Sequence, residues 1–277
     1  MKNLKLFKII LIGYLCIYIY PFFVSIYYSF TNSLSSGRFA GIKNYIDLFR
    51  SEAFRLAAFN TIKYALIAIP VLMGISLLLA LAFNFFLTAF ESKIADRLLG
   101  INLFSMAIPV ASIYLLICTL FGDYGVINGI LKKNILWFNS DYSFWIVLLI
   151  YIWNNCSYCT VIFLVGLNRI DKSIIEAAKI DGAGSVSIFF NIMGIEILPN
   201  LIFNIVLSIA GIFKMYRVSH MLFGNYPHES VYMIQNFLNN NFNNGNFSRL
   251  TAASVIFLLV LFIPIYLMLS FYKRRVK

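Results

Sequence analysis

Six long apolar stretches limit what this chain can fold into more than any other feature of its sequence. Each is long enough, or nearly so, to cross the hydrocarbon core of a bilayer, which takes about 20 apolar residues. The stretches are Ile9–Phe30, Tyr64–Phe86, Leu98–Phe121, Tyr142–Leu167, Ile197–Phe213 and Leu250–Tyr272. Backbone polar groups inside a bilayer must bond to one another, so such stretches form helices. The sequence therefore predicts an all-α integral membrane protein with six transmembrane helices.

The composition excludes a soluble domain. Of the 277 residues, 61% are apolar and only 12% are charged, whereas soluble domains have about 25% charged residues. The net charge of +11 would suit a nucleic-acid partner in a soluble protein, but here the basic residues must lie in loops. The first apolar stretch is too long for a signal peptide and lacks a small-x-small cleavage site, so we expect it to be retained as a span.

The distribution of lysine and arginine predicts the orientation. With the N-terminus inside, the inner segments contain 12 of the 22 basic residues, the outer loops contain 6, and 4 lie at outer span ends. The inner segments are also shorter, so their density of positive charge is higher. The positive-inside rule therefore favours two cytoplasmic termini and a cytoplasmic loop between the fourth and fifth spans.

Two outer segments stand out. In the first, which runs from Thr31 to Phe59, four apolar residues repeat at helical spacing and predict an amphipathic helix in the membrane interface: Ile42, Tyr45, Ile46 and Phe49. The last outer segment, Val218 to Ser248, is rich in asparagine. That segment is either a plain connector or a contact surface for a solute-binding protein.

A polar interruption, Asp171 to Asn200, has the most specific local pattern. Ser173 and Glu176 have the spacing of a capping box, and Gly182 is the residue type that ends a helix in the left-handed conformation. Ser185 is placed to cap a second short helix. The residues alone favour a loop helix lying on the membrane, with a low surface at its alanine pair that a partner's backbone could approach.

The same stretch resembles the EAA loop of ABC-importer permeases. The residues that carry this resemblance, and that the family uses for coupling to its ATPase, are Glu176, Ala177, Ala178, Asp181, Gly182 and Ala183, followed by Pro199. Further matches to the sugar-permease (maltose-transporter-type) branch are Ser29-Phe30-Thr31, Phe39-x-Gly41-x-x-Asn44-Tyr45, Asn60-Thr61 and Gly125-x-x-Asn128. The matches run in the same order over nearly the whole chain.

Two departures from the family pattern involve lost prolines. Asp171 stands where the family usually has a proline before its coupling helix, and could serve as an additional N-cap. Ile195 stands at the place of another proline, with an unusual neighbour in Glu196. The second change leaves the angle at which the chain leaves the loop undefined.

The resemblance implies a permease subunit of an ATP-driven importer for a sugar or oligosaccharide in the bacterial cell membrane. It divides the chain into residues 1–58, the first span with its outer segment, and residues 59–277, a transport core with a coupling loop at 168–199. The implied partners are a second, homologous permease in a heterodimer, two cytoplasmic ATPase subunits, an extracytoplasmic solute-binding protein and membrane lipid. ATP and Mg²⁺ would be bound by the ATPase subunits, and no cofactor, enzyme activity or nucleic-acid partner is expected of this chain.

No catalytic or metal-binding constellation is present in the sequence. It lacks the G-x-x-x-x-G-K-[ST] phosphate loop, and Cys156 and Cys159 fit buried residues on one helix face better than a redox or metal pair. Polar residues in spans are the first candidates for a transport path. The candidates here are Asn154, Asn155, Tyr158, Asn204, Lys214, Tyr216 and Arg217. Each also has a plain structural role open to it, in helix packing or at the membrane interface.

Two other functions stay open from the residues. The chain could be an ABC permease for a peptide, an amino acid or phosphate. It could also be a secondary transporter working alone. A secondary transporter needs a membrane-embedded acidic residue to couple ions or protons. The predicted spans contain none away from their ends.

Overall fold

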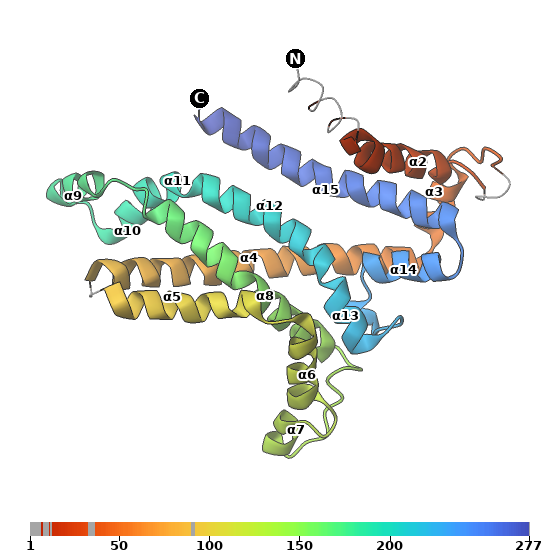
Figure 1. The fold of residues 1–277 in the computed structure, drawn as a ribbon, viewed down its shortest axis with the longest axis horizontal. Helices are drawn as coiled ribbons and strands as arrows, with labels where there is room; N and C mark the ends of the chain where they lie inside the picture. The colour runs from red at the N-terminus through yellow and green to blue at the C-terminus, as the bar shows by residue number, and fades with distance from the viewer. Residues whose placement is uncertain (1–6, 8–10, 12, 33–36, 90–91, 277) are drawn as a thin grey trace. The chain divides into compact units, whose positions relative to one another are not determined.

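The computed structural model describes the chain except for residues 1–6, 8–10, 12, 33–36, 90–91 and 277. The described part is helical, with one isolated bridge between Thr31 and Phe39 (Figure 1). Its longer helices are α2 (Tyr20–Ser29), α3 (Lys43–Arg50), α4 (Glu52–Ala89), α5 (Ser92–Ala107), α6 (Val110–Phe121), α8 (Tyr142–Leu167), α9 (Lys172–Ile180), α12 (Leu198–Lys214), α13 (Tyr216–Phe223), α14 (Ile234–Asn243) and α15 (Phe247–Val276). The short ones are η1 (Leu15–Ile19), α7 (Val126–Leu131), α10 (Ser185–Ile188), η2 (Phe189–Met193), α11 (Gly194–Glu196) and η3 (Glu229–Val231).

The helical membrane architecture predicted from the apolar stretches is confirmed. Within the described residues, five helical segments are long and apolar enough to cross a bilayer. The fourth predicted span coincides with α8, and the fifth and sixth match α12 and α15 to within a few residues at most ends. The first predicted span is described as a shorter apolar helix, Leu15–Ser29, and part of its N-terminal end lies outside the described residues.

Two of the predicted span limits are wrong. The third span, Leu98–Phe121, is two helices, because α5 ends at Ala107 and α6 begins at Val110. Pro109 causes the break, since its ring clashes with the preceding turn and disfavours a helical residue before it. The helix of the second span begins at Glu52 rather than near Tyr64, because residues 52–59 are themselves amphipathic and bury Phe54.

The chain forms two compact units. One contains residues 1–59 and 233–266, and the other contains residues 60–232 and 267–277. In the first unit, the predicted amphipathic helix is confirmed as α3. Asn44 at its start donates hydrogen bonds to the carbonyl oxygens of Ser29 and Thr31, both at 2.8 Å, and Tyr45 bonds to the Ser29 hydroxyl at 2.7 Å. These contacts fold the outer segment back onto the end of α2.

The second unit is organised around α8, which buries 15 of its 26 residues. Helices α5 and α12 both contact α8, and α6 contacts α7 and α13. Helix α4 also contacts α8, because the Tyr64 hydroxyl donates a hydrogen bond to the Val147 carbonyl at 3.1 Å. Figure 1 shows α9 and α10 at one end of α8, and α6 with α7 at its opposite end.

A ladder of side-chain-to-backbone hydrogen bonds joins α8 to α12. Asn200 donates to the Ile162 carbonyl at 2.9 Å, and Asn204 donates to the Cys159 carbonyl at 3.0 Å. The Tyr151 hydroxyl donates to the carbonyl of Ser208 at 2.7 Å. The donors and acceptors on α12 are four residues apart, so they share one helix face. We call these three bonds the α8–α12 seam.

Two glycines bring the two helices of the seam close together. A Cβ atom added at Gly166 would lie 2.7 Å from Oδ1 of Asn200, and one added at Gly211 would lie 3.2 Å from Oδ1 of Asn155. The pattern was not identified from sequence, because polar residues and glycines scattered through an apolar stretch do not reveal which helices meet. Asparagines at four-residue spacing on one apolar helix are the signal that could have found it.

Candidate functional site

The predicted coupling helix is α9, and its N-terminus differs from the capping box predicted from sequence. Asp171 is the N-cap, and its carboxylate accepts a hydrogen bond from the backbone N–H of Ser173 at 2.9 Å. That hydrogen bond holds the pKa of the Asp171 carboxyl below its ordinary value. Ser173 instead lies within the helix, so the Ser173–Glu176 capping box is wrong. The aspartate at the family's proline position therefore starts the helix by capping it, as the sequence allowed.

The C-terminus of α9 is the glycine end that the sequence predicts. Gly182 has a φ of +83°, a conformation that residues with a Cβ rarely adopt. Its N–H donates to the Lys179 carbonyl at 3.1 Å, and the N–H of Ala183 donates to the Ala178 carbonyl at 2.9 Å. This pair of bonds is a Schellman motif. Both ends of a nine-residue helix are thus fixed by local bonds.

Helix α9 buries none of its residues within this chain. Ile180 is 86% exposed and Ile174 is 47% exposed, although both are large and apolar. Glu176 and Ala177 are exposed and Ala178 is partly so. The large apolar side chains at both ends of α9 are thus left open to contact with another molecule.

The chain returns from α9 to α12 through nearly continuous helical turns. Gly184, not Ser185, is the N-cap of α10, and no side chain caps it, so the predicted serine cap is wrong. The turns of η2 and α11 then lead to Ile197, where α12 begins. Ile195, at the family's second proline position, sits inside this run of turns. The backbone N–H of Ile197 donates to the Met193 carbonyl at 2.9 Å, so the helical turns continue past Ile195.

A polar cavity of about 610 Å³ brings together four of the predicted transport-path residues. Asn154 and Asn155 line it from α8, and Tyr216 and Arg217 line it from α13. The Tyr216 ring stacks on His220 with centroids 5.3 Å apart, which fixes its orientation. The remaining lining residues are Gly211, Phe213, Met215 and Val218.

The other predicted path residues lie elsewhere. Asn204 is fully buried in the α8–α12 seam and does not line the polar cavity. Tyr158 lies beside Ser208 and Cys159, away from the cavity lining. The side chain of Lys214 is outside the described residues.

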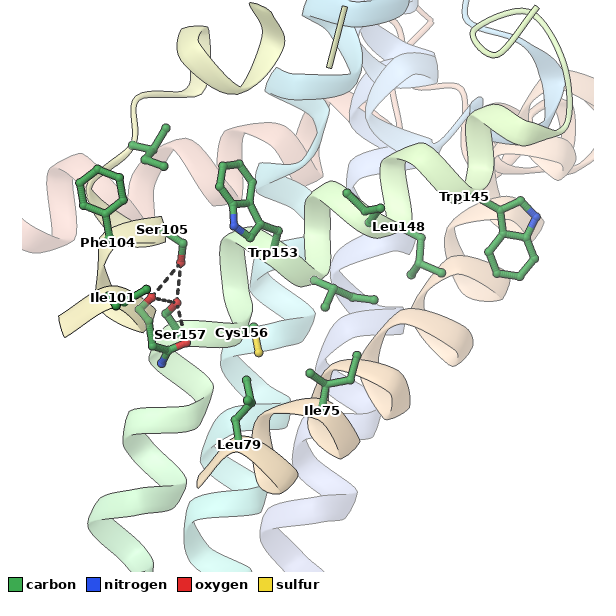
Figure 2. A pocket seen from close by; sticks show the side chains of 14 residues that line it. Ile75, Leu79, Ile101, Phe104, Ser105, Trp145, Leu148, Trp153, Cys156 and Ser157 are labelled. Atoms are coloured by element: carbon green, nitrogen blue, oxygen red, sulfur yellow. Dashed lines mark hydrogen bonds between the residues drawn. The ribbon is translucent and has the colours of Figure 1, made fainter. Parts of the chain in front are cut away.

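A larger cavity, of about 850 Å³, lies between α4, α5 and α8 and is mainly apolar. Figure 2 shows Trp145 and Trp153 at its α8 wall, with Ile75 and Leu79 from α4 below them. Its polar corner is the Ser105–Ser157 hydroxyl pair (Figure 2). Cys156, a free thiol, is part of the lining. This cavity is not indicated by any sequence pattern, because its walls come from three separate apolar stretches.

Comparisons with known proteins agree with the geometry. The family described as binding-protein-dependent transport system inner membrane component matches residues 85–277. The sulfoquinovosyl glycerol transport system permease protein of Agrobacterium fabrum is 30% identical over 235 residues, which are 81% of this chain and 75% of that protein. The sn-glycerol-3-phosphate transport system permease protein of Yersinia pestis is 28% identical over 247 residues, 87% of this chain and 83% of that protein.

The fold also has a solved counterpart. A crystal structure of a bacterial alginate ABC transporter, in complex with an alginate pentasaccharide-bound periplasmic protein, contains a chain similar to this one. The TM-score is 0.85 at 18% identity, and the match covers 100% of this chain and 96% of that chain. The all-α fold predicted from the sequence is therefore that of an ABC-transporter membrane subunit.

Proposed function

Because this chain belongs to the family of binding-protein-dependent transport system inner membrane components, we propose that it forms half of the membrane pathway of an ATP-driven importer for a sugar or oligosaccharide. One relative supports this cargo, since its name gives a transport system for sulfoquinovosyl glycerol, which contains a sugar. The name of the other gives sn-glycerol 3-phosphate, which is a polyol phosphate and not a sugar. The solved counterpart was crystallised with an alginate pentasaccharide on its periplasmic protein.

The proposed assembly has five protein chains of four kinds. This chain pairs with a second, homologous permease, two ATPase subunits bind on the cytoplasmic side, and a solute-binding protein delivers cargo from outside. ATP and Mg²⁺ are held by the ATPase subunits, and this chain takes no part in hydrolysis. The chain lacks a phosphate loop in its sequence, which supports that division of labour.

The proposed topology has six spans with both termini and α9 in the cytoplasm. The surplus of basic residues in the predicted inner segments supports it. So does the position of α9, at the end of α8 remote from α6 and α7 (Figure 1).

The single observation that carries the coupling proposal is that α9 is capped at both ends and yet uncovered. Local bonds at Asp171 and Gly182 define where the helix begins and ends, and none of its residues is buried in this chain. Its exposed apolar residues and its small alanines then form a contact surface for the ATPase. We infer that Glu176, Ala177, Ala178, Asp181, Gly182 and Ala183 belong to that contact.

The mechanism follows from how α9 connects to the spans. When the ATPase subunits close on ATP, α9 moves with them as a rigid body. The turns between Gly184 and Ile197 pass that movement to α12, and the α8–α12 seam makes α8 follow. Residues Asn154, Asn155, Tyr216 and Arg217, which these helices position, then change their access from one side of the membrane to the other.

The test is Gly182→Glu with a matched control. Gly245 ends α14 with the same motif at a φ of +70°, and like Gly182 it has nothing within 4 Å of an added Cβ. Each substitution costs roughly 1–2 kcal/mol for a left-handed residue with a Cβ, so both variants should insert. We expect Gly182→Glu to lower the ratio of sugar taken up to ATP hydrolysed by at least about 10-fold, or 1.4 kcal/mol of coupling.

The control variant, Gly245→Glu, should keep the wild-type ratio of sugar taken up to ATP hydrolysed, because Gly245 is not in α9. Both quantities are measured on the complete transporter in proteoliposomes. A normal ratio in Gly182→Glu would refute the coupling role of α9, and failure to take up any saccharide by the wild type would refute the cargo.

A further inference from the structure

We propose that the polar cavity recognises an anionic saccharide, one that carries a carboxylate, sulfonate or phosphate group, through Arg217. The inference rests on the proposed sugar-importer function and specifies the substrate class for it. It starts from the charge of the cavity. Arg217 is the charged residue in its lining, and no aspartate or glutamate of the described residues lines it.

Within the described part of the chain the guanidinium of Arg217 makes no hydrogen bond or ion pair, although its side chain borders the cavity. Arg217 is exposed, so a ligand that enters the cavity can reach its guanidinium. The walls here include Phe213, Met215 and Val218, of which the last two are buried.

The guanidinium also has the right shape for an oxyanion. Its planar fork of N–H groups donates two parallel hydrogen bonds to a carboxylate or phosphate, and such charge-assisted bonds are about twice as strong as neutral ones. A neutral sugar would satisfy the fork only through hydroxyls. The cavity therefore favours a ligand with negative charge at this place.

The remaining lining residues suit the neutral part of a saccharide. Asn155 donates its amide N–H to the Tyr151 carbonyl at 2.6 Å, which leaves its oxygen as an acceptor for a hydroxyl. Asn154 makes no hydrogen bond to the described residues, so its amide group is available to a ligand. The fixed ring of Tyr216 offers a flat surface for the apolar face of a sugar ring. One cation, two amides and one aromatic ring together define an acidic sugar site.

The experiment compares pairs of saccharides in which one member has an anionic group that the other lacks. The complete transporter in proteoliposomes is given pairs such as trigalacturonate and its methyl ester, cellobiouronate and its methyl ester, and glucose 6-phosphate and glucose. Uptake of each acid is divided by uptake of its neutral partner. Because the solute-binding protein is the same for every permease variant, its own preference cancels when this ratio is compared between variants.

We expect the wild type to take up at least one acid of the panel faster than its neutral partner. Arg217→Gln should lower that acid-to-neutral ratio by about 10- to 100-fold, the usual effect of losing a hydrogen-bonded charge pair. Arg217→Lys keeps the positive charge but loses the planar fork of N–H groups. Its acid-to-neutral ratio should lie between those of the wild type and Arg217→Gln. Arg217 is exposed, so these variants should reach the membrane in normal amounts.

Lys63→Gln is the matched control, since it removes one positive charge outside the cavity. The Lys63 ammonium lies over the Phe144 ring, 5.2 Å from its centroid. The acid-to-neutral uptake ratio of Lys63→Gln should equal that of the wild type. An unchanged ratio in Arg217→Gln, an equal loss in Lys63→Gln, or uptake of neutral members alone would overturn the inference and leave the importer function standing. Uptake of no member would overturn both.

Discussion

Helices α9 and α14 are built by the same local rules and yet do different things. Each has about ten residues, and each ends in a Schellman motif at a left-handed glycine, Gly182 in one and Gly245 in the other. Helix α9 buries no residue in this chain, whereas α14 buries Ile234, Asn236, Phe237, Asn240 and Asn241. Local sequence thus decides where a helix begins and ends, and burial decides whether it serves the fold or a partner.

The largest expected effect tests burial itself. Phe237 of α14 is 3% exposed and packs edge-on against Phe54 with centroids 5.5 Å apart, while Ile180 of α9 is 86% exposed. Phe237→Ala should lower the free energy of unfolding by about 3–5 kcal/mol, because it leaves a cavity in the core. Ile180→Ala should change it by less than about 0.5 kcal/mol. Thermal unfolding of the two variants in detergent measures both, and equal shifts would break the comparison.

The second prediction concerns transport, for which a change in α9 should matter although it hardly affects stability. Ala177→Arg places a long cation on the exposed surface of α9, where the ATPase is proposed to bind. We expect uptake to fall about 10-fold, equivalent to 1.4 kcal/mol, with a normal melting temperature. Copurification of the ATPase should fall in parallel. A variant that loses uptake but keeps its ATPase would show that α9 acts without direct contact at this position.

A smaller effect is expected at the start of α14. Oδ1 of Asn236 accepts a hydrogen bond from the backbone N–H of Met233 at 3.1 Å. Asn236→Ala should cost about 1 kcal/mol of stability, as loss of a cap-type bond usually does. Gln235→Ala, at the neighbouring and partly exposed residue, leaves the Asn236 bond in place and serves as the control in the same unfolding assay. If the two variants melt alike, the capping bond is not what stabilises this end.

The smallest effect concerns pH at the start of α9. The pKa of Asp171 is lowered in the folded chain by its bond from Ser173. Its cap is therefore fully present above the ordinary carboxyl pKa of about 3.9 and is lost as the pH falls through the lower folded value. The protection of the Ser173 amide against hydrogen exchange should therefore be the same at pH 7 and at pH 5. Asp171→Ala should lose the protection at pH 7, and Asp171→Asn should keep most of it.

The sequence was sufficient for features that are set locally. The length of an apolar stretch predicts a membrane helix, and the fourth prediction coincides with α8 at both ends. The end of α9 at Gly182 was equally predictable, because only glycine takes that conformation freely. The family resemblance itself also needed no structure. Its motifs included Asn44 and Asn60, which the structure shows as donors to carbonyls of distant segments.

What the sequence could not supply depends on which helices meet. Asn204 and Asn154 are both asparagines in predicted spans, but one lies in the seam and the other lines the polar cavity. The choice of Asp171 over Ser173 as N-cap was also ambiguous, because both residue types cap helices and they are two positions apart. Pro109 is plain in the sequence, but the apolar run around it is long enough for one span, so the break between two helices was not predicted.

The α8–α12 seam has a consequence for how this protein can vary. Two of its three bonds end on main-chain oxygens of α8, at Cys159 and Ile162, so no side chain of either residue takes part. A saturation library should accept other apolar residues of similar size at 159 and 162. It should reject most changes of the donors Asn200 and Asn204. At these two bonds tolerance would then be one-sided, because α12 supplies the side chains and α8 supplies only main-chain oxygens. At the third bond the order is reversed, since Tyr151 of α8 is the side-chain donor.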